Sequence, residues 1–371
     1  MSSRVGREEH SRTIQTAVLR KAGKPLAIES LKLDGPREDE VLVCVAASGI
    51  CHTDVGLIET FSDSDSPLVL GHEGSGVVEQ VGKQVKTVKE GDHVVLSYQS
   101  CGICPECLDR RPWSCRSFYE ANFGFARLDG SNALARSRVR GHFFGQSSFS
   151  THSLATERNL VKVPEDLDLE LLGPLGCGLQ TGAGTVLNTL AVRPNTGIAI
   201  LGTGSVGLAA VMAARIAGAN PIIGVDINRH RLELALELGA SNVIHSREAD
   251  VALAVSRITA GGVDYTVDTT GDDDVLRLAV DLLKAGGTAA LLTGAPSPSP
   301  LKAGRKTIQV IQGSSIPQEF IPRLIKYFRG GLFPFDRLVT YYDFADINRA
   351  IADARAGRTI KPVLRIRKST M

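Results

Sequence analysis

The first third of the chain alternates short hydrophobic, β-branched runs with turns that are rich in Gly, Pro and Asp. Runs of this length, bounded by turn residues, are typical of β-strands. The glycines between them allow the sharp corners that a small, irregular β-barrel needs. The predicted strands are Thr13–Arg20, Ala27–Leu33, Glu40–Val45, Val77–Val81 and His93–Leu96.

From Gln180 the pattern changes, and apolar strands alternate with amphipathic helical stretches. The stretch Leu232–Gly239 ends in a glycine that commonly stops a helix, and Val275–Leu283 has apolar residues at helical spacing. Strands joined by helical crossovers predict a doubly wound parallel sheet. Its six expected strands are Ile198–Leu201, Pro221–Val225, Asn242–Ile244, Tyr265–Asp268, Thr288–Leu292 and Thr307–Ile311.

After Pro317 the pattern predicts a helix, a strand around Leu338–Tyr342, a second helix and a last strand near Val363–Ile366. We expect these elements to return to the first domain. A chain of 371 residues is also longer than one hydrophobic core usually serves. The sequence therefore predicts an α/β protein whose β-rich domain comprises residues 1–178 and 319–371, with the parallel-sheet domain at residues 179–318.

Composition is that of an ordinary folded protein, with 43% hydrophobic and 22% charged residues. The net charge is only +2 and no long block of like charge occurs, so nucleic acid and membrane surfaces are not expected partners. Met1–Arg12 lacks the apolar core of a signal peptide, which predicts a loose tail and a cytoplasmic protein. Ile198–Val225 is apolar enough for a membrane span, but Arg215, Pro221 and several glycines favour a buried strand, helix and strand.

Four cysteines lie within fifteen positions, at Cys101, Cys104, Cys107 and Cys115. Two-residue gaps let thiolates converge on a tetrahedral zinc, and four thiolates leave no open position, which indicates a structural ion. An iron–sulfur site is one alternative, but the short ferredoxin motif has three residues between its third and fourth cysteines and a proline after the fourth. Here seven residues separate Cys107 from Cys115, and Arg116 follows. A pair of disulfides is the other alternative. It is disfavoured because the seven cysteines are an odd number in a chain without a signal peptide.

A glycine fingerprint, Gly202-Thr-Gly204-Ser-Val-Gly207, follows an apolar strand and opens an alanine-rich helical segment. The first glycine permits a tight turn, the second lets backbone amides approach a pyrophosphate, and the third lets the helix pack on the strand. Asp226 follows Gly207 by 19 residues, where a carboxylate would bind the ribose hydroxyls and repel a 2′-phosphate. The sequence therefore predicts NAD in preference to NADP. Arg231 could reach the same ribose or be a surface cation.

Three distant segments supply two more thiols and an imidazole, at Cys51, His72 and Cys177. A Cys₂His set leaves the fourth position of zinc open for water or substrate. Taken singly, Cys51 also suits a small buried hydrophobe and His72 a hydrogen-bonded structural histidine. Spacing alone does not establish that the three segments converge.

The motifs Cys51-His-Thr-Asp54, Gly71-His-Glu-Gly74 and Gly176-Cys-Gly178 occur together with the four-cysteine loop and the glycine fingerprint. Their order and spacing resemble those of the zinc-dependent medium-chain alcohol dehydrogenases over nearly the whole chain. Within this family, His142–Phe149 and Leu172–Gly182 look most like the aryl-alcohol (benzyl alcohol) dehydrogenase branch. The resemblance implies a GroES-like catalytic domain built from both ends of the chain and a Rossmann domain between them.

The resemblance also implies NAD and two zinc ions per chain. Cys51, His72 and Cys177 would hold the catalytic zinc, with Glu73 as an alternate ligand and Asp54 orienting His72. The structural zinc would take Cys101, Cys104, Cys107 and Cys115. The implied cofactor-binding residues are His52, Thr181, Gly202, Gly204, Val206, Gly207, Asp226 and Arg231.

The implied reaction is the oxidation of a primary aryl or allylic alcohol to its aldehyde, and the reverse, by hydride transfer from a zinc-bound alkoxide. Thr53 would relay the alcohol's proton toward the nicotinamide ribose. Phe143 and Phe144 align with substrate-pocket positions and suit a flat alcohol, and packing in the domain core is the alternative for them.

Two departures from the family concern the proton path. Many relatives have a histidine five residues after the first zinc cysteine, where this chain has Gly56. Many also have an arginine at the position of His52, and a titrating imidazole should clamp a pyrophosphate less firmly than a guanidinium. We therefore expect His52 to make NADH release depend on pH and to supply part of the missing relay.

Other functions stay open at this point. Within the enzyme class they are oxidation of terpenoid or aliphatic alcohols and of the glutathione adduct of formaldehyde. Outside it, a non-catalytic NAD-binding structural protein is conceivable, but the intact Cys51, Thr53, His72 and Cys177 argue against that. The expected partners are a small-molecule alcohol or aldehyde and further copies of the chain, as a homodimer or homotetramer.

Overall fold

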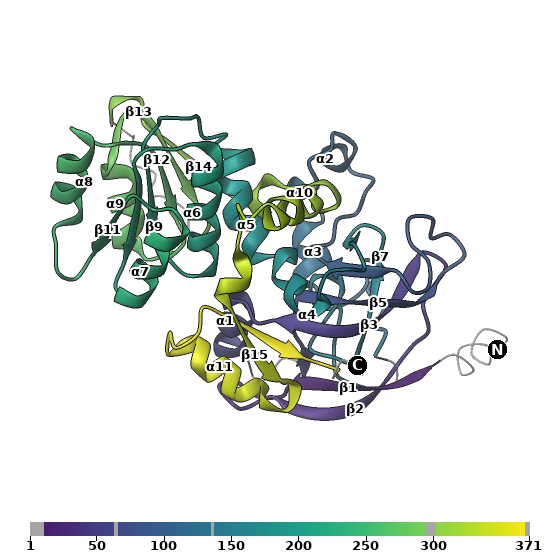
Figure 1. The fold of residues 1–371 in the computed structure, drawn as a ribbon. Helices are drawn as coiled ribbons and strands as arrows, with labels where there is room; N and C mark the ends of the chain where they lie inside the picture. Colours follow the sequence, from purple (N-terminus) through teal and green to yellow (C-terminus); the bar gives the residue numbers. More distant parts are fainter. Residues whose placement is uncertain (1–10, 63–65, 135–136, 294–301, 368–371) are drawn as a thin grey trace. The chain divides into compact units, whose positions relative to one another are not determined.

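The chain folds into two compact units in a computed structural model, which describes residues 11–62, 66–134, 137–293 and 302–367 (Figure 1). The first unit comprises Met1–Cys177, Ile316–Pro322 and Leu338–Met371, and the second comprises Gly178–Ser315 and Arg323–Arg337. Most of the predicted N-terminal tail, residues 1–10, lies outside the described residues.

The division departs from the predicted boundary at residue 318. Residues Arg323–Arg337 fall into the second unit and not into the β-rich one. Arg337 of this segment forms an ion pair with Glu237, which also lies in the second unit. The two residues are 100 positions apart in the sequence, so no local sequence pattern predicts their contact.

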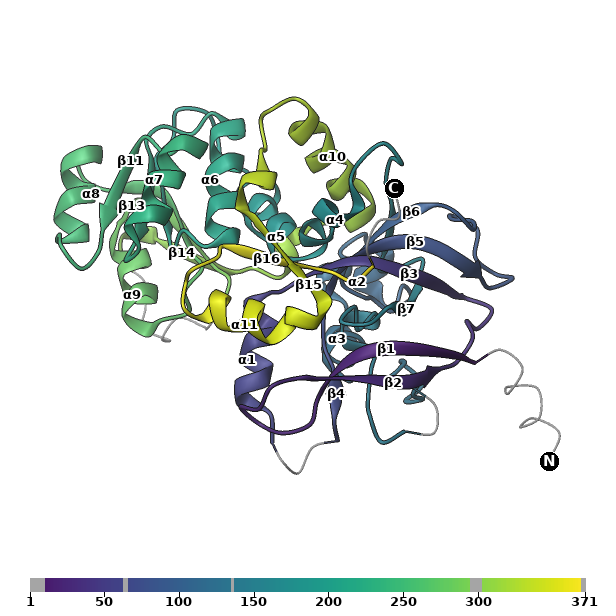
Figure 2. The same ribbon diagram turned by 60° about the horizontal axis from the view of Figure 1, so that its bottom comes forward.

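The described strands of the first unit are β1 (Arg12–Leu19), β2 (Ala27–Leu33), β3 (Glu40–Gly49), β4 (Leu68–Val69), β5 (Glu73–Val81), β6 (His93–Leu96), β7 (His152–Thr156), β8 (Leu160–Lys162), β15 (Val339–Asp343) and β16 (Lys361–Arg365). They form a three-stranded sheet ordered β2-β1-β4 and a seven-stranded sheet ordered β15-β16-β3-β5-β6-β8, in which β7 also pairs with β3. The antiparallel pairing of β16 with β3 brings the end of the chain beside its first third (Figure 2).

Strand β3 lies between two hydrophobic clusters. Leu42 packs into one cluster with Val18 and Leu154, whereas its neighbours Val41 and Val43 pack into the other. Successive side chains of a strand point to opposite faces, so both faces of β3 are covered here. The helices of the first unit are α1 (His52–Thr60), α2 (Pro105–Leu108), α3 (Phe118–Phe123), α4 (Leu169–Leu172) and α11 (Ile347–Arg355), while α10 (Pro317–Arg329) begins in the first unit and ends in the second.

The second unit contains a parallel sheet with the order β11-β10-β9-β12-β13-β14. This is the doubly wound order, so the predicted fold class is confirmed. Its strands are β9 (Ile198–Leu201), β10 (Ile222–Asp226), β11 (Asn242–His245), β12 (Val263–Asp268), β13 (Leu283–Leu291) and β14 (Lys306–Gln309). Strand β13 begins earlier than predicted, at Leu283, which the apolar spacing had assigned to the preceding helix.

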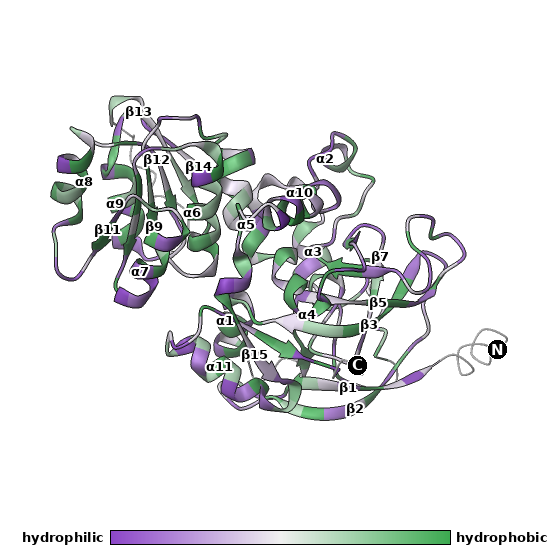
Figure 3. Cartoon of the chain, viewed as in Figure 1, coloured by the Kyte–Doolittle hydropathy of each residue, from purple (hydrophilic) through white to green (hydrophobic). Residues whose placement is uncertain are grey.

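The helices of this unit are α5 (Gly178–Gly184), α6 (Ser205–Ala217), α7 (Arg229–Leu238), α8 (Val251–Thr259) and α9 (Asp273–Asp281). Helices α8 and α9 pack on the sheet face that presents Leu201 and Val225. On the other face, the third fingerprint glycine, Gly207 of α6, lies against Ile200. Hydrophobic residues dominate the central strands, whereas hydrophilic ones gather on α7 (Figure 3).

Helix ends follow the sequence signals. Asn228, Asp250 and Asp272 each accept a backbone N–H from the first turn of the helix they precede. Helix α7 ends at Gly239, which has a φ of +127°. The apolar segment 198–225 is β9, α6 and β10, and within the described residues no helix is long and apolar enough to cross a membrane.

Candidate functional site

The buried carboxylate of Asp54 connects two loops of the first unit. Its Oδ2 accepts the backbone N–H of Cys51 at 3.0 Å, and its Oδ1 accepts that of Gly71 at 3.0 Å. The same Oδ1 lies 3.1 Å from Nδ1 of His72. Gly71 has a φ of +90°, and a Cβ there would overlap Phe149, so glycine is required at this turn. Asp54 thus holds Cys51 and His72 together.

Four predicted metal ligands converge beside this carboxylate. Ligand atoms of Cys51, His72, Glu73 and Cys177 all lie within 4.8 Å of one another. Nε2 of His72 is buried and makes no hydrogen bond. A buried ring nitrogen without a partner is costly, and a bound metal would take the place of any proton on it and use its lone pair. Two thiols and an imidazole fit zinc, although their role as ligands stays a prediction.

Charges in this cluster are arranged to stabilise a thiolate. The hydrogen bond from Cys177, followed by the effect of His72, brings the pKa of Cys51 well below its ordinary value in spite of burial. The same hydrogen bond, with burial, raises the pKa of Cys177 well above its ordinary value. Burial disfavours a charged His72, but the Asp54 carboxylate and then Cys51 together outweigh burial and raise the pKa of His72 to about 10.

A lysine that the sequence analysis missed holds Glu73. Nζ of Lys361 lies 2.9 and 2.8 Å from the two carboxylate oxygens of Glu73, and it donates to the carbonyl of Ile50 at 3.3 Å. The two residues are 1% and 0% exposed. A Cβ on Gly49 would overlap Oε2 of Glu73, so that glycine makes room for the carboxylate. Glu73, the predicted alternate ligand, therefore points at an ammonium group as well as at the cluster.

One sequence signal could have found Lys361. It is the first residue of β16, whose next residues, Pro362, Val363 and Leu364, are buried. A lysine that opens a buried strand needs a buried anion. The partner could not be identified from the sequence, because Lys361 and Glu73 are 288 positions apart.

Aromatic rings surround His72. Phe144 stacks on the imidazole with centroids 4.5 Å apart, and Phe143 meets it edge-on at 5.1 Å. Both phenylalanines are buried, and Phe123, which the sequence analysis did not single out, contacts both rings. The structure thus gives Phe143 and Phe144 a packing role beside the predicted zinc ligand. Their contact with substrate stays a prediction.

Helix α1 carries the predicted proton path. Oγ1 of Thr53 lies 3.8 Å from Sγ of Cys51, and His52 is exposed at the first position of the helix. A Cβ placed on Gly56 would meet nothing within 4 Å. Residues four apart in a helix share a face, so His52 and Gly56 are neighbours on α1. The absence of a side chain at Gly56 is therefore not imposed by crowding.

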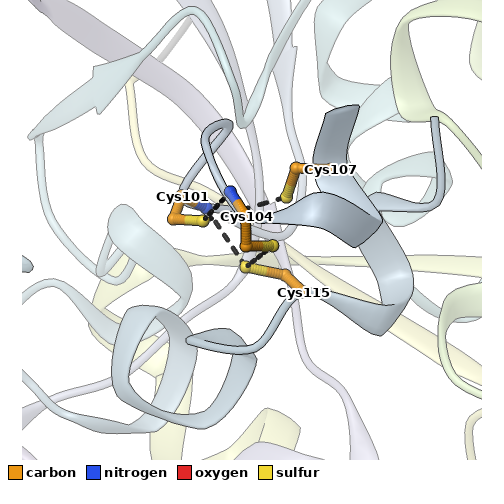
Figure 4. A group of neighbouring side chains, drawn as sticks. All are labelled: Cys101, Cys104, Cys107 and Cys115. Atoms are coloured by element: carbon orange, nitrogen blue, oxygen red, sulfur yellow. Dashed lines mark hydrogen bonds between the residues drawn. The ribbon is translucent and has the colours of Figure 1, made fainter. Parts of the chain in front are cut away.

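The four-cysteine loop brings its thiols together, as Figure 4 shows. The sulfurs of Cys101 and Cys107 are 3.9 Å apart, and those of Cys104 and Cys115 are 4.0 Å apart. A disulfide requires about 2.05 Å, whereas sulfurs about 2.3 Å from a tetrahedral zinc are roughly 3.8 Å apart. All seven cysteines are free thiols, which excludes the disulfide alternative for the described structure.

Backbone N–H groups also prepare the loop for thiolates. Cys101 donates to Sγ of Cys115 at 3.3 Å, and Cys104 donates to Sγ of Cys101 at 3.4 Å. The backbone hydrogen bond from Arg116 lowers the pKa of Cys104 to about 7. Burial instead raises the pKa of Cys115 to about 12. A cation among the four sulfurs is the group that would let all of them ionise.

The glycine fingerprint forms the tight turn between β9 and α6. Gly202 has a φ of +86°, and a Cβ on Gly207 would overlap the carbonyl oxygen of Gly202. A Cβ on Gly204 would meet nothing within 4 Å, which leaves the backbone there accessible. Asp226, at the end of β10, accepts the backbone N–H of Thr203 at 2.6 Å and its hydroxyl at 2.9 Å. These contacts fix the predicted ribose acceptor beside the loop.

The other predicted cofactor residues lie on helices of the second unit. Arg231 is on α7, and its Nε is buried without a hydrogen-bond partner. Thr181 is on α5 and Val206 is on α6, and the residue after Thr181, Gly182, lies so close to α6 that a Cβ on it would overlap the carbonyl oxygen of Val206. The cofactor roles of these residues and of His52 stay predictions.

Comparison with known proteins gives two family matches. The family described as "Zinc-binding dehydrogenase" matches residues 205–326, and that described as "Alcohol dehydrogenase GroES-like domain" matches residues 37–165. The geraniol dehydrogenase of Castellaniella defragrans is 46% identical over 363 residues, which are 94% of this chain and 97% of that protein.

Two solved structures are similar over 96% of this chain and 100% of their own. One is an alcohol dehydrogenase zinc-binding domain protein from Burkholderia ambifaria, with 47% identity and a TM-score of 0.92. The other is the benzyl alcohol dehydrogenase of Acinetobacter calcoaceticus, with 42% identity and a TM-score of 0.91.

Loss of one thiol should empty the loop site alone. We expect Cys104→Ser to contain one zinc fewer per chain and to melt several degrees lower, because a structural zinc contributes to folding. Elemental analysis and thermal unfolding provide the two measurements. Cys51→Ser is the matched control and should lose the other zinc with a smaller change in melting temperature. Equal zinc content in Cys104→Ser and the parent would contradict the assignment.

Removal of the Lys361 ammonium group should destabilise the fold, because it leaves the Glu73 carboxylate buried without a cation. We expect Lys361→Met to lower the free energy of unfolding by about 3–5 kcal/mol, because a buried carboxylate loses its cation. Denaturant unfolding of the zinc-loaded protein measures this. The double variant Lys361→Met/Glu73→Gln should recover part of the loss. A single variant as stable as the double one would show that the pair matters little.

Proposed function

This chain belongs to the zinc-dependent medium-chain alcohol dehydrogenases, and we propose that it oxidises primary aryl or allylic alcohols to aldehydes, and reduces those aldehydes, with NAD. Membership of the family implies both zinc and NAD. The observation that carries the proposal is the convergence of Cys51, His72 and Cys177 around an unpartnered imidazole nitrogen. Aromatic rings pack directly against that imidazole.

We assign two zinc sites per chain, one at Cys51, His72 and Cys177 and one at the four-cysteine loop. At the first, zinc supplies the Lewis acidity that makes an alcohol more acidic, and NAD supplies the hydride acceptor. Asp54 accepts the Nδ1 proton of His72, which directs the Nε2 lone pair into the cluster. Lys361 balances the charge of Glu73 beside it.

The proton path begins at Thr53. Its hydroxyl lies close to Sγ of Cys51, where it can accept the proton of an alcohol held at the cluster. The next acceptor on the same helix is His52, which is exposed and can exchange protons with water. This short path takes the place of the longer one that a histidine at position 56 would provide.

The second unit supports NAD as the cofactor. The backbone around Gly204 is open to a pyrophosphate at the start of α6. The Asp226 carboxylate is held at the end of β10, where ribose hydroxyls are bound in this fold. A fixed negative charge there disfavours the 2′-phosphate of NADP.

The substrate class follows from the rings and from two relatives. Geraniol and benzyl alcohol, after which those relatives are named, both carry a hydroxymethyl group next to an sp² carbon. A flat π-system of this kind packs well against phenylalanine rings. Phe143 and Phe144 support this choice, because they lie against the predicted zinc ligand His72. Homodimer or homotetramer formation and a cytoplasmic location stay predictions.

A substrate panel tests the proposed class. We expect kcat/KM with NAD to be higher for benzyl alcohol than for ethanol. It should also be about 2–10-fold higher for geraniol than for citronellol, which lacks only the allylic double bond, since ring contacts typically contribute this much. Steady-state kinetics with NAD and NADP make the comparison. Better turnover of ethanol, or a requirement for glutathione with formaldehyde, would overturn the proposal.

Two variants of helix α1, which remove the histidine at position 52 and then add one at position 56, test the proton path. We expect His52→Ala to lower kcat for alcohol oxidation by about tenfold or more, because general bases commonly contribute at least that. Gly56→His in the same background should restore much of the rate, since position 56 has room for a side chain on the same helical face. Stopped-flow hydride transfer and the NADH off-rate separate chemistry from release. Unchanged values of both in His52→Ala would exclude a role for this residue.

A further inference from the structure

A second mixed cluster of metal-binding side chains lies on the seven-stranded sheet, apart from both predicted zinc sites. Ligand atoms of Cys44, Glu79 and His152 are all within 4.8 Å of one another. Cys44 on β3 is paired directly with His152 on β7, so their side chains share one face. Neither residue has a role in the proposed reaction.

A break in strand register brings in the third residue. Val43 pairs with Val78 and Leu42 pairs with Gln80, which leaves Glu79 as an extra residue of β5. Such a bulge redirects the side chain of its unpaired residue. The carboxylate of Glu79 reaches the face of Cys44, where Oε2 lies 3.1 Å from Nε2 of His152.

Both ring nitrogens of His152 have hydrogen-bond partners. Nη1 of Arg12 lies 2.8 Å from Nε2 of His152, and a guanidinium can only donate. Nε2 accepts this hydrogen bond in the tautomer that carries its proton on Nδ1, which lies 3.1 Å from the hydroxyl oxygen of Thr151, whereas in the other tautomer Nε2–H donates to Glu79. A neutral imidazole with a free lone pair on Nε2 is the form that binds metals.

Three electron-pair donors of different kinds therefore face one another, and a cation already lies among them. Arg12 forms an ion pair with Glu79 as well as its bond to His152. Arg367 is a second cation next to Cys44. The Arg12 and Glu79 side chains are 38% and 36% exposed, so the guanidinium can leave and an ion can enter from solvent.

We propose that Cys44, Glu79 and His152 form a third metal site, which takes zinc or another borderline divalent ion in place of the Arg12 guanidinium. One sulfur, one nitrogen and one oxygen ligand suit zinc and cobalt, and a water molecule completes a tetrahedron. Hard ions such as magnesium prefer oxygen ligands and are poor candidates. The ion and Arg12 compete for the same two side chains, Glu79 and His152, so the charge of Arg12 lowers the affinity of the site for the ion.

Cobalt titration of the zinc-loaded enzyme tests the site. Co²⁺ bound to Cys44 should give a thiolate-to-metal absorption band and one equivalent beyond the resident zinc, while zinc released into solution stays constant. Cys44→Ser and His152→Gln should lose this equivalent. Arg12→Gln should bind the extra Co²⁺ about 5–10-fold more tightly, because a partly exposed ion pair and a hydrogen bond usually contribute about this much free energy.

Matched controls keep the test decisive. His230 and Glu233 form an exposed pair on α7 without a cysteine, so His230→Gln should leave the extra equivalent unchanged. Glu79→Gln provides a second, partly exposed change at the site should Cys44→Ser fold poorly. An extra equivalent that persists in Cys44→Ser or Glu79→Gln, or no extra equivalent in Arg12→Gln, would overturn the proposal.

Discussion

The Asp54 carboxylate is the contact on which the predicted metal site depends. It accepts the backbone N–H groups of Cys51 and Gly71 and lies against Nδ1 of His72, so one buried group orients two ligands from different loops. Each of these polar groups would otherwise be buried without a partner, which is costly. The hydrogen bonds that fold α1 onto the next loop are thus the same ones that direct the imidazole of His72.

The balance of charge in the predicted metal site also depends on a residue near the end of the chain, Lys361. Thiolates and a carboxylate cannot gather in a buried cluster without cations, because burial favours neutral forms. His72 is one cation in the metal-free cluster, and Lys361 on β16 is another. The pairing of β16 with β3 therefore completes the electrostatics of the site as well as the sheet.

Local features were predictable from the sequence, and long-range ones were not. The four-cysteine loop and the glycine fingerprint each lie within a short segment, so spacing alone specifies their chemistry. The family resemblance, now confirmed by the comparisons, joined Cys51, His72 and Cys177 across the sequence. The ion pair of Lys361 with Glu73 depends on strand pairing, which no periodicity reveals. The grouping of Arg323–Arg337 with the second unit is likewise not visible in a local pattern, because Arg337 contacts a residue 100 positions away in the sequence.

The clusters differ in what neutralises their donors. In the four-cysteine loop, backbone N–H groups point at the sulfurs of Cys101 and Cys115, and in the other cluster Nε2 of His72 has no hydrogen-bond partner, so each cluster has donors that a zinc ion would satisfy. At Cys44, Glu79 and His152 the guanidinium of Arg12 already fills that position. An ion there must displace a side chain that already contacts two of the three ligands. We therefore expect the site at Cys44, Glu79 and His152 to bind a metal ion more weakly than the two predicted zinc sites, and to exchange it with solvent.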